Sequence, residues 1–218
     1  MFKCLELFSG THSFGKVAEE IGYSVLSLDL ILSADIKEDI LTWDYKKYPK
    51  NSFDIIWASP PCTFYSRLQN TWIGRKRKDG TLVTKEWIEV QRKESDLIMK
   101  KTLEIIDYFN PFLWFIENPV SCLKDREIMK NIPYYTCDYC MYCDWGYRKR
   151  TNIWTNKEDW TPLICNKDCG NMFIHKTNLG NDIRKKHKAD VSKNFGGGTN
   201  RLDRYRMPPN LIFSLLQE

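Results

Sequence analysis

The stretch that decides the fold is Cys4-Leu5-Glu6-Leu7-Phe8-Ser9-Gly10-Thr11-His12-Ser13-Phe14-Gly15. Its first residues are mostly apolar and are typical of a short strand, and residues 16–21 after the turn have apolar positions at helical spacing. A strand, a glycine turn and a helix form the nucleotide-binding opening of α/β domains, because glycine lets the backbone approach a ligand closely. With two glycines the turn is a weak signal by itself, so the prediction depends on the residues that follow.

The next segments extend the same pattern. Residues 24–28 are predicted to form a second strand that ends in Asp29, about twenty residues after the glycine turn, where an acid can accept hydrogen bonds from ribose hydroxyls. Asp39 and Ile40 begin another loop, which we place near an adenine ring. Strands and helices alternate through about residue 120, which predicts an α/β domain with a doubly wound, mostly parallel sheet.

A third apolar run, residues 53–58, leads directly into Ser59-Pro60-Pro61-Cys62. Loops at the carboxyl ends of parallel strands are where ligands bind in doubly wound sheets. Two prolines fix the backbone before Cys62, which suits a thiolate nucleophile that must meet a carbon atom at a fixed angle. The alternative is a strand that ends in a Pro-Pro turn with an inert cysteine.

Two further motifs carry charge. The apolar run at residues 112–116 is typical of a central parallel strand and ends in Glu117, which is either a catalytic acid or a solvated residue at the sheet edge. Arg148 and Arg150 flank Lys149, and alternation along a strand would place both arginines on one face. The alternative for this triplet is an ordinary charged surface turn.

Together these motifs resemble those of DNA cytosine-5 methyltransferases, in the same order and across roughly residues 1 to 155. The chain is most similar to the short members of this family that phages and large DNA viruses often carry. The matching segments are Phe8-Ser9-Gly10-Thr11, Asp29, Pro61-Cys62, Ile116-Glu117-Asn118-Pro119 and Tyr147-Arg148-Lys149-Arg150. The chain departs from the family pattern at Thr63, where a glutamine is usual, at Pro119, where a valine is usual, and in having no long target-recognition domain.

The resemblance implies a class I, Rossmann-like, S-adenosylmethionine-dependent methyltransferase that methylates carbon 5 of cytosine in DNA. Cys62 would add to carbon 6 of the ring, which makes carbon 5 nucleophilic. Glu117 would contact ring nitrogen 3 and the exocyclic amine, and Arg148 and Arg150 would hold the base oxygen and a phosphate. The residues that would contact S-adenosylmethionine are Phe8, Ser9, Gly10, Thr11, Asp29, Leu30, Asp39, Ile40 and Pro60.

Two alternatives remain open for the function. The same chemistry could act on a free cytosine nucleotide or on RNA, which the short chain makes credible. The alternative from another class is a nucleic-acid-binding module without catalytic activity, which would keep the fold and a zinc-stabilised segment. The presence of Cys62, Glu117 and the two arginines together favours an enzyme, because a module without catalytic demands needs none of them in combination.

The cysteines form a second pattern. The chain has eight, and five of them lie in Cys137-x-x-Cys140-x-x-Cys143 and Cys165-x-x-x-Cys169, with His175 six residues further on. In a chain without a secretory pattern, clustered cysteines favour metal binding over disulfides. Four ligands complete a tetrahedral zinc site, and the set we predict is Cys140, Cys165, Cys169 and His175. The other two cysteines are alternative ligands, and ordinary free thiols are the alternative to a metal.

Composition is compatible with an intracellular enzyme that binds DNA. The net charge is +5 over 218 residues, 42% of which are hydrophobic, and no apolar run reaches the length of a membrane span. We expect a monomer with a catalytic domain at residues 1–154. A small, basic Cys/His-containing insertion follows at residues 155–200, and residues 201–218 return to the catalytic domain.

Overall fold

The computed structural model describes residues 1–176, 183–188 and 205–217, with the backbone alone at residues 174–176 and 183–185. Much of the predicted insertion at 155–200, and the first residues of the segment 201–218, therefore lie outside the described residues. No helix in the described ranges is long and apolar enough to cross a membrane.

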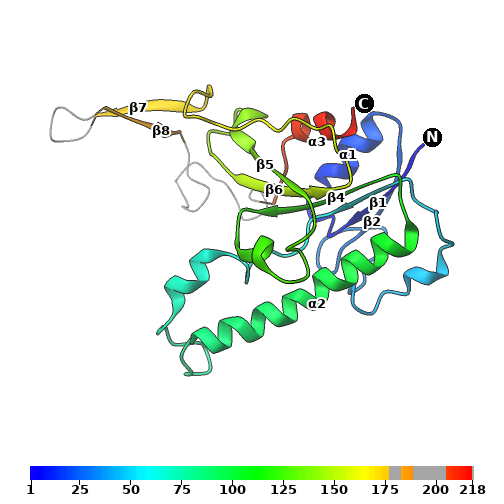
Figure 1. Cartoon of the computed structure of the whole chain (residues 1–218), viewed down its shortest axis with the longest axis horizontal. Helices are drawn as coiled ribbons and strands as arrows, with labels where there is room; N and C mark the ends of the chain where they lie inside the picture. Colours follow the sequence, from blue (N-terminus) through cyan, green and yellow to red (C-terminus); the bar gives the residue numbers. More distant parts are fainter. Residues whose placement is uncertain (177–182, 189–204, 218) are drawn as a thin grey trace.

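A six-stranded sheet with the order β2-β1-β3-β4-β6-β5 forms the centre of the molecule (Figure 1). Its strands are β1 (Lys3–Leu7), β2 (Ser24–Leu28), β3 (Ile55–Ala58), β4 (Leu113–Pro119), β5 (Tyr134–Asp138) and β6 (Arg150–Thr155). The first four are parallel to one another, whereas β6 runs antiparallel to both β4 and β5. The predicted doubly wound, mostly parallel sheet is confirmed.

Helices cover both faces of this sheet. On one face lie α1 (Ser13–Glu20) and α3 (Pro209–Leu216), and on the other lies the long helix α2 (Lys85–Phe109) (Figure 1). Side chains alternate accordingly, because successive residues of a strand point to opposite faces. Leu5 and Leu7 of β1 pack in the core that contains α2, whereas Cys4 of β1 and Trp57 of β3 pack in the core that contains α1 and α3.

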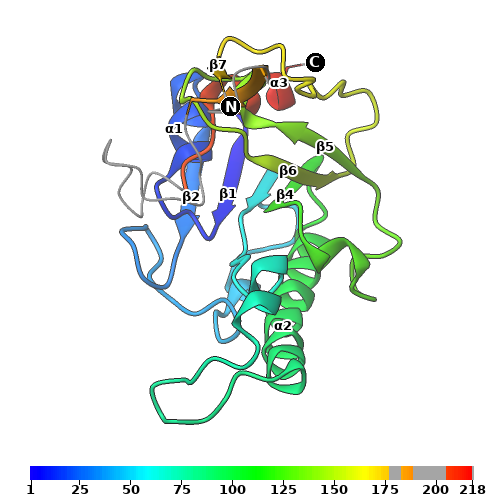
Figure 2. The same cartoon turned by 90° about the vertical axis from the view of Figure 1, so that its left-hand side faces the viewer.

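Shorter elements connect and extend this core. Four 3₁₀ turns, η1 (Tyr45–Lys47), η2 (Arg67–Trp72), η3 (Cys122–Asp125) and η4 (Tyr139–Met141), lie between the main elements. Strands β7 (Met172–Lys176) and β8 (Ile183–His187) form a separate antiparallel hairpin. It projects beyond the β5–β6 side of the sheet in Figure 1 and points toward the viewer in Figure 2.

The strand order fixes where a ligand can bind. From β1 the chain proceeds to β2 on one side, and β3 and β4 lie on the other side, so the order reverses between β1 and β3. At such a switch point the loops after the two strands diverge and leave a crevice at the carboxyl edge of the sheet. The loop after β1 and the Pro-Pro-Cys loop after β3 both begin at this edge.

Candidate active site and candidate metal centre

The loop after β1 has an unusual backbone and a buried acid beneath it. Phe8, Gly10 and His12 all have positive φ, at 58°, 55° and 57°. Glu6, which is 1% exposed, accepts a hydrogen bond from the N–H of Phe14 at 3.1 Å and lies 2.5 Å from Nδ1 of His12. The bond to Glu6 raises the pKa of His12 to about 9, although burial opposes the shift. His12 is therefore a cation held under this loop at neutral pH.

Asp29 connects the loop after β1 to the end of β2. Its Oδ2 accepts from the N–H of Gly10 at 3.0 Å, and its Oδ1 accepts from the N–H groups of Ile31 and Leu32 at 2.8 Å. A carboxylate can accept about four hydrogen bonds. One acceptor position therefore remains for a ligand hydroxyl.

The surroundings of Asp29 fit a ligand with both polar and apolar parts. Ser9 is 6% exposed and its hydroxyl has no hydrogen-bond partner within the described residues, so a ligand atom would satisfy it. Leu30 and Ile31 leave 55% and 77% of their surface exposed beside the carboxylate, an apolar surface on which a flat ring can rest. The donor and acceptor set at this edge therefore fits an adenosine-containing cofactor.

Three other predicted cofactor contacts have structural partners of their own. Oδ1 of Asp39 accepts from the N–H of Leu41 at 2.9 Å and closes a turn. Ile40 is 3% exposed and belongs to the core on the α2 side, so little of its side chain can reach a ligand. Pro60 is buried and accepts a hydrogen bond through its carbonyl oxygen from Nδ2 of Asn118 at 3.0 Å.

The loop that carries Cys62 is held at several points. Besides the Asn118 contact, Sγ of Cys122 donates to the carbonyl of Tyr65 at 3.1 Å, and Nε of Arg92 donates to the carbonyl of Phe64 at 3.1 Å. The N–H of Tyr65 in turn donates to the carbonyl of Cys62 at 3.1 Å. The half-buried thiol of Cys62 is therefore presented by a fixed backbone.

Glu117 lies at the end of β4 in a polar group beside Cys62. It is 5% exposed, and its Oε1 accepts from the hydroxyl of Tyr139 at 3.0 Å and lies 3.5 Å from Nζ of Lys149. Nζ of Lys149 also lies 4.7 Å from the centre of the Tyr139 ring. Burial and the Glu117 carboxylate raise the pKa of Cys62, and the Lys149 ammonium acts in the opposite direction. Cys62, Glu117 and Lys149 therefore form one electrostatic unit.

The two arginines lie together, but on another acid. Nε of Arg148 donates to Oδ1 of Asp138 at 2.9 Å, and Arg150 donates to Oδ1 from Nε at 3.0 Å and to Oδ2 from Nη2 at 2.8 Å. Asp138 is fully buried, and these three bonds with a fourth from the N–H of Cys165 lower its pKa against the effect of burial. The arginine side chains remain 30% and 39% exposed. Arg148 and Arg150, called the arginine pair from here on, are therefore held in place by Asp138 while their side chains stay partly exposed to solvent.

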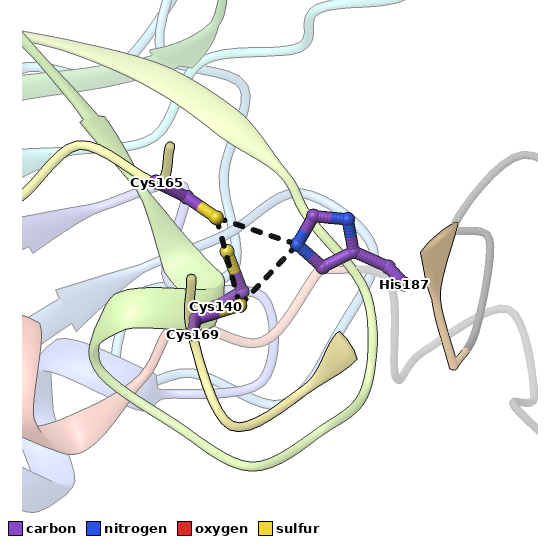
Figure 3. A group of neighbouring side chains, drawn as sticks. All are labelled: Cys140, Cys165, Cys169 and His187. Carbon is purple, nitrogen blue, oxygen red and sulfur yellow. Dashed lines mark hydrogen bonds between the residues drawn. The ribbon is translucent and has the colours of Figure 1, made fainter. Parts of the chain in front are cut away.

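A cluster of sulfur and nitrogen atoms is contributed by η4, the segment after β6 and the end of β8 (Figure 3). One potential ligand atom from each of four residues lies within 4.8 Å of every other, and all eight cysteines of the chain are free thiols. The members of this Cys/His cluster are Cys140, Cys165, Cys169 and His187. The structure therefore brings together the three cysteines that the spacing favoured.

The fourth member is His187, where the sequence led us to expect His175. The hairpin register explains the difference, because it pairs His187 with Met172, three residues after Cys169, and pairs His175 with Arg184 further along. The side chain of His175 lies outside the described residues. Cys137 is buried in the core beside α1 and α3, and Sγ of Cys143 donates to the carbonyl of Tyr139 at 3.2 Å, so neither belongs to the cluster.

Sequence reasoning missed several of these residues. No sequence motif indicated a role for Tyr139 or Lys149, and Lys149 was noted only as the residue between the two arginines. Asp138 follows the strand-like segment of β5, but its partners come from segments 10 to 27 residues away in the chain. His187 lies in the basic run Arg184-Lys185-Lys186-His187-Lys188 of the predicted insertion, 18 residues after Cys169, and no ligand spacing marked it.

Comparison with known proteins identifies the relatives of this chain. No family model matches it. The "Probable DNA (cytosine-5)-methyltransferase" of Frog virus 3 (isolate Goorha) is 38% identical over 218 residues, which cover 98% of each chain. The solved structure of the Entamoeba histolytica methyltransferase EhMeth has a TM-score of 0.52 and 14% identity, over 76% of this chain and 56% of that chain. The structural likeness supports the α/β fold, and the identity over nearly the whole length shows that this chain belongs to the DNA (cytosine-5)-methyltransferase family.

Proposed function

We propose that the protein transfers the methyl group of S-adenosylmethionine to carbon 5 of cytosine in DNA through a covalent bond to Cys62. The observation that carries the proposal is the unit of Cys62, Glu117 and Lys149 at the carboxyl edge of the sheet, next to the loop after β1. A thiol, an acid and a cation from three separate segments meet where the fold leaves a crevice.

S-adenosylmethionine, when bound, supplies a methyl group that is activated by a sulfonium charge. The remaining acceptor position of Asp29 would hold a ribose hydroxyl, and Leu30 with Ile31 would cover the adenine. The Phe8–Thr11 loop would lie along the methionine part, where the free hydroxyl of Ser9 gains a partner. The 38% identical relative supports this assignment through its name.

Cys62 would supply the nucleophile. The reactive form is the thiolate, so the thiol proton leaves to water before the bond from Sγ to ring carbon 6 forms. Lys149 is the nearby cation that favours this ionisation, in opposition to burial and to Glu117. After methylation, carbon 5 loses its proton to water, and the electrons of that bond form the double bond between carbons 5 and 6 as the bond from Sγ to carbon 6 breaks. The proton that nitrogen 3 accepted during addition returns to Glu117, so the Cys62 thiolate and Glu117 are both regenerated.

Glu117 would hold the base and move a proton. Its carboxyl group contacts ring nitrogen 3 and the exocyclic amine, and a proton passes to nitrogen 3 while the ring accepts electrons from the thiolate. The hydroxyl of Tyr139 and the ammonium of Lys149 orient Oε1 for this task. The arginine pair, held on Asp138 and partly exposed, would contact DNA phosphate and the oxygen of the base.

DNA is the proposed partner, because the chain carries a net charge of +5 and its relative is named for DNA. A stacked base cannot reach Cys62, so the cytosine must be flipped out or already single-stranded. Zn²⁺ is proposed as a structural ion only, without a part in the chemistry at Cys62.

The test offers labelled S-adenosylmethionine with duplex DNA, single-stranded DNA, RNA or dCMP in separate reactions. We expect transfer to DNA, and a DNA containing 5-fluorocytosine should trap a covalent adduct at Cys62, because its fluorine cannot leave as a proton does. Transfer only to RNA or dCMP would move the activity to another substrate. Absence of both transfer and adduct would refute methyl transfer.

A further inference from the structure

The Cys/His cluster has the dimensions of an occupied tetrahedral site. Sγ of Cys165 and Sγ of Cys169 are 3.5 Å apart, and Nε2 of His187 lies 3.6 Å and 3.4 Å from them. Ideal zinc bonds of about 2.3 Å to sulfur and 2.0–2.1 Å to nitrogen give separations of roughly 3.8 Å between sulfurs and roughly 3.6 Å between sulfur and nitrogen. These three ligand atoms are therefore spaced nearly as they would be around one ion, and Sγ of Cys140 lies within 4.8 Å of each of them.

We propose that the Cys/His cluster binds one structural Zn²⁺, and that this ion fixes the arginine pair through Asp138. Three thiolates and an imidazole are a soft ligand set that suits zinc and excludes magnesium and calcium, which bind oxygen. Four protein ligands leave no open position for water or substrate, so the ion is structural.

The surroundings of the cluster are those of a supported metal site. The N–H of Lys167, which has φ of 64°, donates to Sγ of Cys165 at 3.3 Å. Asn171 is 4% exposed and donates from Nδ2 to the carbonyl of Cys140 at 2.9 Å. Hydrogen bonds to thiolate sulfur and to the ligand backbone fix the ligands before the metal arrives. They also join the segment after β6 to η4.

Asp138 connects the cluster to the arginine pair. The N–H of Cys165 donates to Oδ2 of Asp138 at 2.9 Å, and the same carboxylate accepts both arginines. Because Asp138 is 0% exposed, removing any one partner leaves a buried charge less compensated. A metal that holds Cys165 in place therefore holds Asp138 and, through it, the arginine pair.

The first experiment measures metal in the full chain, purified under reducing conditions without chelator. We expect about one equivalent of zinc in the wild type, and a large loss in Cys169→Ser and His187→Gln. Cys143→Ser and His175→Gln are matched controls that should keep the ion. Wild-type protein without stoichiometric metal would overturn the proposal. Loss of metal in His175→Gln together with its retention in His187→Gln would overturn the ligand set.

Cobalt provides a readout that does not depend on how the variants fold. Co²⁺ exchanged into the wild type should give the intense thiolate-to-metal absorption and visible bands of a tetrahedral sulfur-rich site. A spectrum with only the weak bands of an octahedral oxygen site would contradict binding at the cluster.

The second experiment measures DNA binding without turnover, because this half of the proposal rests on the proposed function. Metal-depleted protein and Asp138→Asn, which should retain its zinc, should each bind DNA about tenfold more weakly. The slope of log K against log salt should fall by about 1 for each DNA phosphate that the arginine pair no longer neutralises. S-adenosylmethionine affinity should stay within a few fold.

The outcomes separate the two proposals. Unchanged DNA affinity and salt slope in both proteins would overturn the link through Asp138, whatever the metal content. Failure of the proposed function would appear differently, as absent methyl transfer and absent adduct in wild-type protein that contains its zinc.

Discussion

Cys62 and Cys165 show how the same side chain acquires different properties in two regions of one molecule. Cys62 is half-buried in the loop after β3, and burial together with the Glu117 carboxylate raises its pKa. Cys165 is buried too, but hydrogen bonds from the N–H of Lys167 and from neighbouring thiols lower its pKa. In the first region a carboxylate and an ammonium act on the Cys62 thiol, and in the second several thiols gather around backbone donors. Neighbouring dipoles and charges therefore shift the pKa values of the two thiols in opposite directions.

The largest effect should come from removing the thiol of Cys62. Cys62→Ala should lower the rate of methyl transfer by roughly 10⁴-fold or more, because the covalent route is lost, while S-adenosylmethionine binding stays within a few fold. Cys122→Ser is the matched control near the same loop, since a serine hydroxyl can still donate to the carbonyl of Tyr65. Labelled-methyl transfer measures both. Full activity in Cys62→Ala would show that Cys62 is not the nucleophile.

Two aspartates offer a second contrast, since each accepts several backbone or side-chain donors. Asp29→Ala should weaken S-adenosylmethionine binding by about ten- to a hundredfold, the loss expected for a charge-assisted hydrogen bond of roughly 1.5–3 kcal/mol. Asp138→Asn should leave that affinity within a few fold, because Asp138 serves the arginine pair. Calorimetry decides the matter, and equal losses in the two variants would mean that the cofactor site is placed wrongly.

The charges beside Cys62 can be tested by its reactivity. Glu117→Gln should speed alkylation of Cys62 at about pH 8 by about tenfold, and Lys149→Gln should slow it by about tenfold, the change that one pKa unit produces below the pKa. Peptide mapping after brief treatment with iodoacetamide reads out this thiol alone. Changes of the same sign in the two variants would show that the unit of Cys62, Glu117 and Lys149 does not exist in solution.

The smallest effect concerns His12, whose pKa of about 9 exceeds the ordinary value of 6.5. A raised histidine pKa contributes stability that is complete below pH 6.5 and is lost as the pH rises through about 9. At about pH 6 the wild type should melt roughly 2–4 °C above His12→Gln, a difference of about 1 kcal/mol, and by about pH 10 the two should converge. A constant gap across this range would exclude the ion pair with Glu6 as its cause.

Local patterns were sufficient to predict the sheet and the place of Cys62. Strand and helix periods repeat along the first 120 residues, and a loop that follows a parallel strand must open at one edge. The contact of Lys149 with Glu117 was not predictable, because the face that this residue presents just before β6 depends on the antiparallel register of β6 with β4 and β5. His187 depends on a hairpin register for the same reason. The burial of Ile40 depends on packing in the core that contains α2, which the spacing of residues in the sequence does not reveal.

The direction of β6 has a consequence for how this enzyme family can change. Because β6 runs against its neighbours, its first residues rather than its last lie beside the ends of β4 and β5. Lys149 and Arg150 are consecutive and so lie toward opposite faces, one near Glu117 and the other on Asp138. A deletion or insertion of one residue before β6 would exchange them if the strand shifted in register. A single codon lost or gained there can therefore replace the ammonium beside Glu117 and Cys62 with a guanidinium, without any substitution at those positions.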